Sequence, residues 1–379
     1  MTATKPQSES QTIIDDAFMA AALAIGRRNL GRSGPNPAVG AIIVKDGVVI
    51  ARGYTALGGR PHAEAVAVAA AGEAARGATL YATLEPCSHH GATPPCVDTI
   101  IAAGIARVVS ALEDPDDRVA GRGHARLREA GVEVTTGVRA REARADHLGH
   151  ILRVTQGRPM VTLKLAQTAD GYAAGAEHDP RLFITGALAD SVTHIERSLH
   201  SAIMIGYGTA SVDDPLLTVR LPGLEAFKPL RVVLDARLRL SRSSRLAATA
   251  RETPTLVIVG EGVAEAEAQD FAAATGMEVA RAGVDAAGRL ALSEALGELA
   301  RRGITRVFSE GGPRVAESLL VAALADDVVL HTGLRPLGRQ GRLALTATAR
   351  AILEDESRYR LADTSMLGVD RMTRYERIG

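Results

Sequence analysis

Cysteine is scarce in this sequence, with only Cys87 and Cys96 among 379 residues. Two cysteines cannot build a disulfide framework, so the sequence predicts a protein of a reducing compartment, the cytoplasm. The first dozen residues, MTATKPQSESQT, are polar and lack the apolar centre of a secretory signal peptide. Both observations argue against a secreted fold stabilised by disulfides.

Net charge and long apolar runs are missing as well. The 44 Lys and Arg residues balance the 44 Asp and Glu residues, which argues against a general affinity for nucleic acid or for an anionic membrane surface. No uninterrupted apolar run reaches the roughly 18–20 residues that a membrane helix needs. We therefore expect that neither nucleic acid nor a membrane is a partner.

Strand and helix patterns alternate through both halves of the chain, which indicates an α/β architecture with layered sheets. In the first half, residues 39–53 have the pattern of two strands about an Asp-Gly turn, a strong hairpin signal. Helical patterns occur at 13–29, 62–75 and 96–104, with a strand at 78–84. In the second half, strands are expected near residues 160–165, 202–206, 231–235, 255–259, 304–309 and 327–331.

The length of the chain favours two or three domains. A charged and polar stretch, REARADHLGHILRVTQGR, separates the two halves. We therefore expect a disordered N-terminus at 1–12, a first domain at 13–147, a linker at 148–157 and a second domain at 158–379.

Both cysteines lie in one loop rich in proline and histidine, TLEPCSHHGATPPC. Zinc favours thiolate and imidazole ligands, and a catalytic zinc has three protein ligands with the fourth position left to water. His62, Cys87 and Cys96 fit that count. Glu64 lies in the first turn of the same predicted helix as His62, where it can stand beside the metal-bound water and move protons. Zinc deaminases show this H-x-E and P-C pattern, although here the second cysteine follows the first by nine positions instead of three.

Three plainer interpretations compete with a catalytic zinc. The cysteines can be inert or joined to each other, His89 or His90 can complete a closed structural zinc site, and His62 can be an ordinary helix histidine. The combination of HAE with EPC favours the catalytic zinc over all three.

A candidate phosphate site lies in the second half. The segment GYG at 206–208 follows a strand, but Pro215 forbids the long helix that a dinucleotide-binding fingerprint requires. In RVFSEGGPRVAESLL, at 306–320, an apolar strand ends in two glycines and a proline, and a helix begins directly after. The free N–H groups of such a helix can hold a phosphate. A plain strand-to-helix connection explains these residues equally well, so the residues alone leave this site open.

The first half resembles the deaminase half of the bifunctional riboflavin-biosynthesis deaminase–reductase family in four motifs, GPNPAVGAIIV, PHAEAVAV, YATLEPCSHHGATPPC and EDPDDRVAGRG. This resemblance implies a cytidine-deaminase-like, three-layer domain with a mixed sheet. It implies that His62, Cys87 and Cys96 bind one zinc ion per chain and that Glu64 is the catalytic proton shuttle. It also places Asn36 near the substrate base.

The second half resembles the reductase half of the same family in the segments LKLAQTADGYAA, FITG, HIERSLHSAIMIGYGTASVDDPLLTVR, PLRVVLD and SEGG. That half is similar to dihydrofolate reductase in its α/β fold and uses NADPH. The implied cofactor positions are Ala166, Phe183, Thr209, Asp213, Gly312, Pro313, Arg314, Val315, Ala316, Glu317 and Ser318. The implied substrate positions are Arg181, Arg197, Leu217, Arg220 and Glu310. The arginines among them are the cationic donors that a ribose phosphate needs.

The resemblance implies an enzyme with two successive activities. Zinc-dependent hydrolysis would remove an amine from a 2,5-diamino-6-ribosylamino-pyrimidinone 5′-phosphate, and NADPH would then reduce the ribosyl group to ribityl. The expected partners are this small pyrimidine ribosyl phosphate and further copies of the chain, in a dimer or tetramer. The alternatives are a single-activity zinc nucleobase deaminase with a degenerate second half and a non-enzymatic, zinc-stabilised binding protein.

The sequence departs from the family pattern at four positions. Ala92 stands where the family usually has Arg or Lys, Arg181 where Ser is usual, and Ser201 where Asp is common. Phe183 replaces the usual Trp. None of these is a zinc ligand or Glu64, so we expect them to affect substrate affinity rather than the type of reaction.

Overall fold

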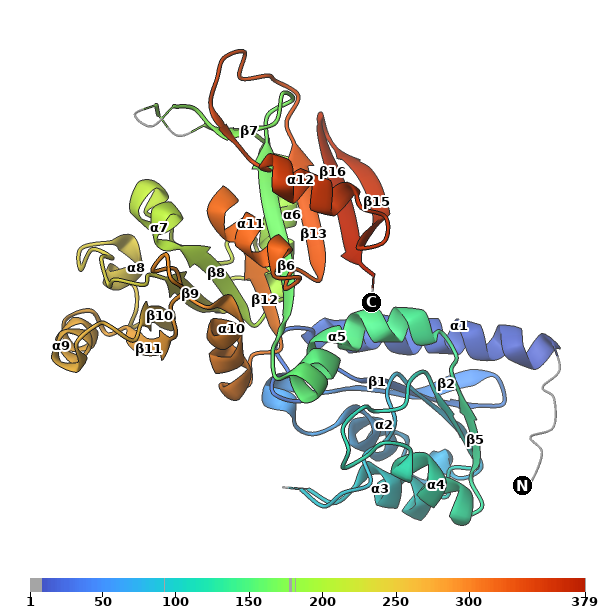
Figure 1. Cartoon of the computed structure of the whole chain (residues 1–379). Coiled ribbons are helices and arrows are strands. Elements are labelled where there is room, and N and C mark those ends of the chain that lie inside the picture. The colour runs from blue at the N-terminus through green and yellow to red at the C-terminus, as the bar shows by residue number, and fades with distance from the viewer. Residues whose placement is uncertain (1–8, 92, 177–178, 181, 379) are drawn as a thin grey trace. The chain divides into compact units, whose positions relative to one another are not determined.

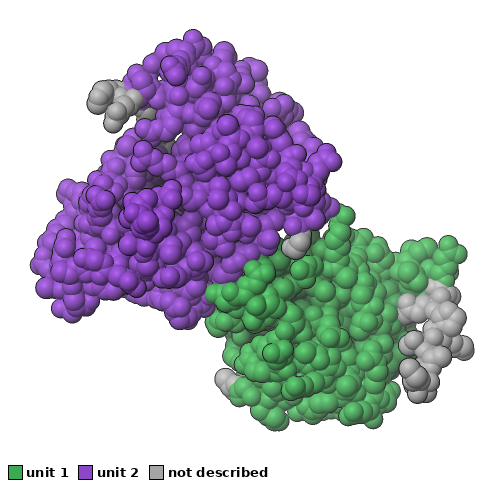
Figure 2. Space-filling model, viewed as in Figure 1, with its two compact units in different colours: residues 1–157 green, residues 158–379 purple. Residues whose placement is uncertain are grey.

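The computed structural model describes residues 9–91, 93–176, 179–180 and 182–378. It divides into two compact units, unit 1 at residues 1–157 and unit 2 at 158–379 (Figure 2). Residues 1–8 of the expected disordered N-terminus lie outside the described residues. Residues 9–12 are not disordered but belong to the first helix. Near the start of this helix, Gln11 Nε2 donates to Asp15 Oδ1 at 3.0 Å, a contact between side chains one turn apart that stabilises the helix.

Five strands form a mixed sheet in the described part of unit 1, in the order β2-β1-β3-β4-β5 (Figure 1). Their bounds are β1 Gly40–Lys45, β2 Val48–Tyr54, β3 Thr79–Ala82, β4 Arg107–Ser110 and β5 Glu133–Thr136. β1 pairs antiparallel with β2 and β3, whereas β3, β4 and β5 are parallel. Asp46 and Gly47 connect β1 to β2 with positive φ angles, the conformation that a tight hairpin turn needs. The hairpin expected at 39–53 is therefore present.

Helices cover both faces of this sheet and make unit 1 a three-layer structure (Figure 1). Their bounds are α1 Glu9–Gly26, η1 Arg27–Asn29, η2 Leu57–Gly59, α2 Ala63–Ala71, η3 Gly72–Ala75, α3 Cys96–Ala102, α4 Arg122–Glu129 and α5 Ala140–Gln156. α1 and α5 pack on one face, and α2, α3 and α4 pack on the other. A Cβ atom on Gly53 of β2 would lie 2.0 Å from the carbonyl oxygen of Ala63. The glycine therefore lets α2, which carries predicted site residues, pack directly on the strand.

Residues 148–157 were expected to be a linker, but nearly all of them lie in α5 and belong to unit 1. His150 Nε2 lies 3.0 Å from Asp114 Oδ1, and His147 Nε2 lies 3.1 Å from Thr83 Oγ1. The stretch is polar in sequence, yet both histidines are buried and hydrogen-bonded, which a polarity pattern cannot reveal. A glycine in the left-handed conformation ends the helix at the division between the units.

Nine strands form one sheet in the described part of unit 2, in the order β11-β10-β9-β8-β12-β6-β13-β16-β15. Their bounds are β6 Met160–Gln167, β8 Ala202–Gly206, β9 Leu230–Leu234, β10 Thr255–Gly260, β11 Glu278–Ala282, β12 Arg306–Ser309, β13 Asp327–Thr332, β15 Tyr359–Leu367 and β16 Asp370–Arg377. Neighbours from β11 to β13 are parallel, and β16 is antiparallel to both β13 and β15. β7 Tyr172–Ala174 and β14 Arg342–Leu343 form a separate small ladder. All six strands expected from the sequence are present.

Helices also cover the two faces of this larger sheet. Their bounds are α6 Ala187–Ser198, α7 Tyr207–Asp213, α8 Arg245–Ala248, α9 Glu265–Thr275, α10 Leu292–Arg301, α11 Pro313–Val321 and α12 Ala347–Glu354. α10, α11 and α12 pack on one face with Val161 and Leu163 of β6, and α7, α8 and α9 pack on the other with Ile203 of β8. The parallel neighbours β6, β12 and β8 end side by side, at the edge where such sheets bind ligands.

Among the residues that the structure describes, no helix combines the length and the hydropathy needed to cross a bilayer.

Candidate metal centre and reductase site

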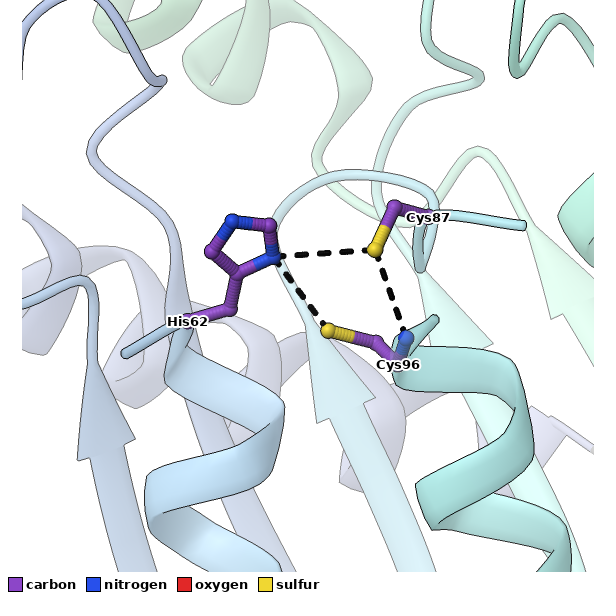
Figure 3. A group of neighbouring side chains, drawn as sticks. All are labelled: His62, Cys87 and Cys96. Atoms are coloured by element: carbon purple, nitrogen blue, oxygen red, sulfur yellow. Dashed lines mark hydrogen bonds between the residues drawn. The ribbon is translucent and has the colours of Figure 1, made fainter. Parts of the chain in front are cut away.

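The three predicted zinc ligands converge in unit 1 (Figure 3). His62 Nδ1 lies 3.6 Å from Cys87 Sγ and 3.4 Å from Cys96 Sγ. All three ligand atoms lie within 4.8 Å of one another. The imidazole and the two sulfur atoms therefore point toward a common centre.

Three different elements bring these side chains together. His62 caps the start of α2, Cys87 lies in the loop after β3, and Cys96 is the first residue of α3. The backbone N–H of Cys96 donates to Cys87 Sγ at 3.3 Å, and that of Val97 donates to the Cys87 carbonyl at 3.2 Å. The first N–H groups of α3 thus donate hydrogen bonds to Cys87. Hydrogen bonds with the Cys96 thiol and with His62 lower the pKa of Cys87 to about 4.

The donor set fits zinc. Two thiolates and one imidazole are ligands that zinc prefers, and three protein ligands leave one position for water. Zinc bonds of about 2.3 Å to sulfur and about 2.0–2.1 Å to nitrogen, at tetrahedral angles, place sulfur and nitrogen about 3.6 Å apart. The two observed separations, 3.6 and 3.4 Å, agree with that value. Neither His89 nor His90 joins the group, and both cysteines are free thiols, so a closed structural site and a disulfide are not supported.

Glu64 lies beside the three ligands in the first turn of α2, only 3% exposed. Burial and, to a smaller extent, the nearby charge of Cys87 together raise the pKa of Glu64 to about 7. The Cys96 side chain acts in the opposite direction and lowers the pKa of Glu64 in part. The carboxylate is therefore next to the donor set without being part of it, a position from which it can pass protons.

Asn36, the predicted contact to the substrate base, is held in a fixed loop. Its Nδ2 donates to the carbonyl of Gly59 at 2.9 Å, and its own carbonyl accepts from Ser33 Oγ at 2.9 Å. The side chain is half-buried, and its contact with substrate remains a prediction.

The predicted cofactor positions of unit 2 gather at the carboxyl ends of its central strands. Ala166 lies near the end of β6, and Thr209 and Asp213 lie on α7, which follows β8. Gly312 caps α11 directly after β12, with Pro313 as the first helical residue. A Cβ atom on Gly312 would lie 3.4 Å from Thr209 Oγ1. The starts of α7 and α11 are therefore neighbours, although they are far apart in the sequence.

The side chains in the segment 312–318 face different ways. Ala316 is buried in the core against the sheet, and Glu317 accepts a hydrogen bond of 2.9 Å from Thr346 Oγ1 at the start of α12. Phe183, another predicted cofactor position, is 89% exposed. The backbone N–H groups at the start of α11 are the part of this segment that suits a phosphate.

Two predicted substrate residues, Arg197 and Glu310, bind each other. Arg197 Nε lies 2.6 Å from Glu310 Oε1, and Nη2 lies 2.9 Å from Oε2. Burial alone would raise the pKa of Glu310, but the charge and hydrogen bonds of Arg197 lower it overall. Arg197 Nη1 also donates to the Thr218 carbonyl at 2.9 Å. Leu217, next to Thr218, has a positive φ of 50° and a buried side chain in the core.

Two neighbours of Arg220 were not singled out from the sequence. Burial and the charges of Arg197 and Arg245 lower the pKa of Arg220, so Arg245 adds positive charge near Arg220 while Arg197 is paired with Glu310. The backbone N–H of Arg220 donates to His194 Nδ1 at 3.3 Å. The spacing of His194 and Arg197, three positions apart on α6, could have indicated the histidine. The contribution of Arg245 depends on tertiary packing.

A cavity of about 310 Å³ lies at the carboxyl ends of β9 and β10. Its lining consists of Ala236, Arg237, Gly260, Gly262, Val263, Glu267, Val284 and Gly288. None of these residues was predicted from the sequence. Several of them directly follow two buried strands, and open α/β sheets bind ligands at such strand ends. That position could have indicated the cavity.

Ser201 does not lie where substrate affinity would depend on it. It precedes β8 at the amino end, and its Oγ donates to the Arg306 carbonyl at 3.1 Å and accepts from the Arg306 N–H at 3.1 Å. Ser201 therefore joins β8 to β12 at the end of the sheet opposite the predicted ligand site. The expectation that serine at this position affects substrate affinity is not supported. Ala92 and Arg181 lie outside the described residues.

Two family models match the chain, one in each unit. Residues 12–112 match the cytidine and deoxycytidylate deaminase zinc-binding region. Residues 159–368 match the RibD C-terminal domain.

Curated relatives extend the similarity over nearly the whole chain. Riboflavin biosynthesis protein RibD of Aquifex aeolicus is 37% identical over 365 residues, which cover 96% of this chain and 99% of the relative. The chain belongs to the RibD family. RibD of Escherichia coli is 35% identical over 369 residues, covering 94% of this chain and 97% of the relative.

Solved structures of RibD proteins agree with this assignment. Acinetobacter baumannii RibD has a TM-score of 0.83 and 31% identity, covering 97% of this chain and 100% of that one. A diaminohydroxyphosphoribosylaminopyrimidine deaminase/5-amino-6-(5-phosphoribosylamino)uracil reductase from Thermotoga maritima has a TM-score of 0.82 and 34% identity, with the same coverage. The expected fold class, a deaminase-like three-layer domain followed by an α/β reductase domain, is confirmed.

As a member of the RibD family, the chain is a bifunctional deaminase and reductase of riboflavin biosynthesis that acts on a small molecule. Zinc and NADPH are its cofactors. A single-activity deaminase with a degenerate second half is not favoured, because residues 159–368 match the RibD C-terminal domain.

Proposed function

We propose that unit 1 deaminates a 2,5-diamino-6-ribosylamino-pyrimidinone 5′-phosphate and that unit 2 reduces the ribosyl chain of the product to ribityl. The T. maritima relative is named for the deaminase and reductase reactions of such compounds. The observation that carries the proposal is the convergence of His62 Nδ1 on the two cysteine sulfurs, with Glu64 buried beside them.

In unit 1, His62, Cys87 and Cys96 hold the zinc ion and Glu64 moves the protons. Zinc supplies a water molecule that is acidic enough to attack at neutral pH. The Glu64 carboxylate accepts a proton from the attacking water and delivers it to the departing amino group. One C–O bond forms, one C–N bond breaks, and ammonia leaves. Asn36, fixed by Gly59, is proposed to contact the pyrimidine ring.

In unit 2, the predicted substrate and cofactor residues have separate tasks. When bound, NADPH would supply the hydride for the new C–H bond at C1′ of the ring-opened imine. The C=N double bond becomes a single bond and its nitrogen takes a proton from water. The N-terminal turn of α11 and the adjacent α7 hold the phosphates of the cofactor. Arg220 and its neighbour Arg245 bind the ribose phosphate, because Glu310 already neutralises Arg197.

The cavity at the ends of β9 and β10 is proposed to receive the far end of NADPH. It lies in the same row of strand ends as α7, and β8 and β9 are direct neighbours in the sheet. Arg237, which lines the cavity, provides a cation for a phosphate.

We also propose that the enzyme works in the cytoplasm as a homo-oligomer. The free thiols of Cys87 and Cys96 suit a reducing compartment. β15 is an edge strand with exposed apolar side chains, Leu361 at 62% and Met366 at 61%. Such an edge favours pairing with another copy. Sedimentation of the full chain tests whether it is an oligomer. A double variant, Leu361→Lys with Met366→Lys, tests whether the β15 edge forms the contact and should then sediment as a smaller species.

A coupled assay on the purified full chain tests the proposed reactions. One zinc ion per chain, ammonia release from the diaminopyrimidine and NADPH oxidation with the deaminated product are expected. Zinc-free protein that still releases ammonia contradicts the unit 1 proposal. A protein that does not oxidise NADPH with the deaminated product contradicts the unit 2 proposal.

A further inference from the structure

A second group of possible metal ligands in unit 1 consists of Glu85, Glu113 and His124, whose ligand atoms lie within 4.8 Å of one another. The Glu85 side chain is fully buried, and its two oxygens already accept four backbone N–H bonds. Oε2 accepts from Asp114 at 3.1 Å and from Gly121 at 2.9 Å. Oε1 accepts from Gly123 at 2.8 Å and from His124 at 3.2 Å. With two bonds on each oxygen, Glu85 has no lone pair left for a cation, so Glu85, Glu113 and His124 are not a metal site. Glu85 and its four backbone donors instead form a structural contact, called here the Glu85 junction.

This junction fixes the loop that carries the first zinc-site cysteine. Glu85 lies two positions before Cys87, and its four donors come from the turn after β4 and from the start of α4. The contact is tight, since a Cβ atom on Gly123 would lie 2.2 Å from the carbonyl oxygen of Pro86. The loop is therefore pressed against α4 at the residue next to the cysteine.

Helix α4 also contacts the element that carries the second cysteine. Arg126 Nη1 donates to the Ser88 carbonyl at 3.0 Å, directly after Cys87. Arg126 Nη2 forms an ion pair with Asp98 on α3, the helix that begins at Cys96. One helix thus touches the chain on both sides of Cys87 and the helix of Cys96, and it can set the separation of the two sulfur atoms.

We propose that Glu85 is a positioning residue of the zinc centre, acting through α4 to hold Cys87 at the distance from Cys96 and His62 that zinc requires. The inference rests on the proposed zinc site. Groups behind the ligands of a metal typically change metal affinity by about 10–100-fold when they are replaced. Glutamine at this position has the same shape but turns an N–H₂ group toward two backbone donors, so half of the four hydrogen bonds are lost.

The test compares the full chain with its Glu85→Gln variant. Zinc affinity is measured by competition with a fluorescent chelator, and unit 1 melting is measured with and without zinc. The variant should bind zinc about 10–100-fold more weakly, and the rise in melting temperature caused by zinc should shrink because ligand stabilisation falls with affinity. Reductase activity should be unchanged. Glu129→Gln, the same replacement at an exposed position on α4, is the matched control and should behave as the wild type.

Two results separate the inference from its alternatives. If Glu85→Gln lowers the melting temperature equally with and without zinc and leaves zinc affinity unchanged, Glu85 only stabilises the fold and the inference is wrong. If the wild type binds no zinc, the proposed zinc site itself fails. If Glu85→Gln does not fold, Arg126→Met is tested in its place. The Arg126 side chain is 41% exposed, so its replacement should leave the fold intact. That variant loses the hydrogen bond to Ser88 and the partly exposed ion pair with Asp98, which contributes little. Zinc binding should therefore weaken by about threefold to tenfold, close to the effect of one hydrogen bond, and unchanged affinity would overturn the inference.

Discussion

Arg197 and Glu310 form a bidentate ion pair across unit 2, joining α6 to the residue that follows β12. Both side chains are nearly buried, at 10% and 13% exposure. Arg197 also holds the Thr218 carbonyl. The pair therefore connects α6 and the end of β12 to the loop that carries Leu217 and Arg220. Because Glu310 neutralises Arg197, Arg220 is better placed than Arg197 to bind a phosphate.

Replacing Glu310 by Gln should destabilise unit 2 in a pH-dependent way. The pKa of Glu310 is lower in the folded protein than its ordinary value. Its contribution to stability is therefore complete above the unfolded pKa of about 4.3 and is lost as the pH falls through the folded pKa. At neutral pH we expect a loss of about 3–5 kcal/mol, because Arg197 keeps a buried charge without a partner.

Denaturant unfolding of both proteins from about pH 7 to about pH 3.5 measures this difference. The stability gap between the wild type and Glu310→Gln should narrow toward the acid end. A gap of the same size at both ends would contradict the role assigned to the ion pair.

Replacing Arg220 by Gln should weaken binding of the phosphorylated substrate to unit 2. A charge-assisted hydrogen bond contributes about 1.5–3 kcal/mol, so KM of the reduction should rise by about 10–100-fold while kcat changes little. Steady-state NADPH oxidation with the deaminated pyrimidine measures both constants. Arg301→Gln, at an exposed arginine paired with Glu298 at the end of α10, is the control. An equal change for a substrate without its phosphate would show that Arg220 does not bind that group.

Replacing Glu64 by Gln should stop deamination and leave zinc bound. Loss of a positioned proton-transfer group costs about 10²–10⁴-fold in rate, whereas the three ligands remain in place. Ammonia release, zinc content and NADPH oxidation are measured on the same preparation. Retained ammonia release would show that another group moves the protons, and loss of zinc together with activity would show that Glu64 supports the metal site instead.

Much of the zinc site could be predicted because its residues lie in short motifs with fixed chemistry. His62 and Glu64 share one helix turn, and both cysteines share one loop, so spacing alone suggested their convergence. The direction of the helix-start N–H groups could not be predicted. They point at Cys87 and not at Cys96, which depends on how the loop folds back over α3.

Elements without an apolar run were harder to predict. β15 lies at the edge of the large sheet, and most of its side chains are exposed. No hairpin was therefore predicted there. Arg245 reaches Arg220 only through the fold, so no local pattern could assign it to the phosphate site.

Removing the zinc should separate the two activities. Treatment with a strong chelator should abolish ammonia release and leave NADPH oxidation with the deaminated product unchanged, because the groups of candidate ligands found among the described residues lie in unit 1. Zinc should restore deamination. Cys96→Ser should bind far less than one zinc per chain and should not recover. Loss of reduction on chelation would show that unit 2 depends on the metal.

The boundary of unit 1 can be tested with two fragments that differ only at the end of α5. The fragment 1–157 contains the whole helix, including the buried Leu152 and the contact of His150 with Asp114. The fragment 1–147 lacks both, so we expect it to be less stable by at least about 2–5 kcal/mol, the cost of deleting one packed leucine. Zinc-loaded thermal melts measure the difference, and 158–379 should melt cooperatively on its own. Equal stability of the two N-terminal fragments would show that residues 148–157 act as a linker after all.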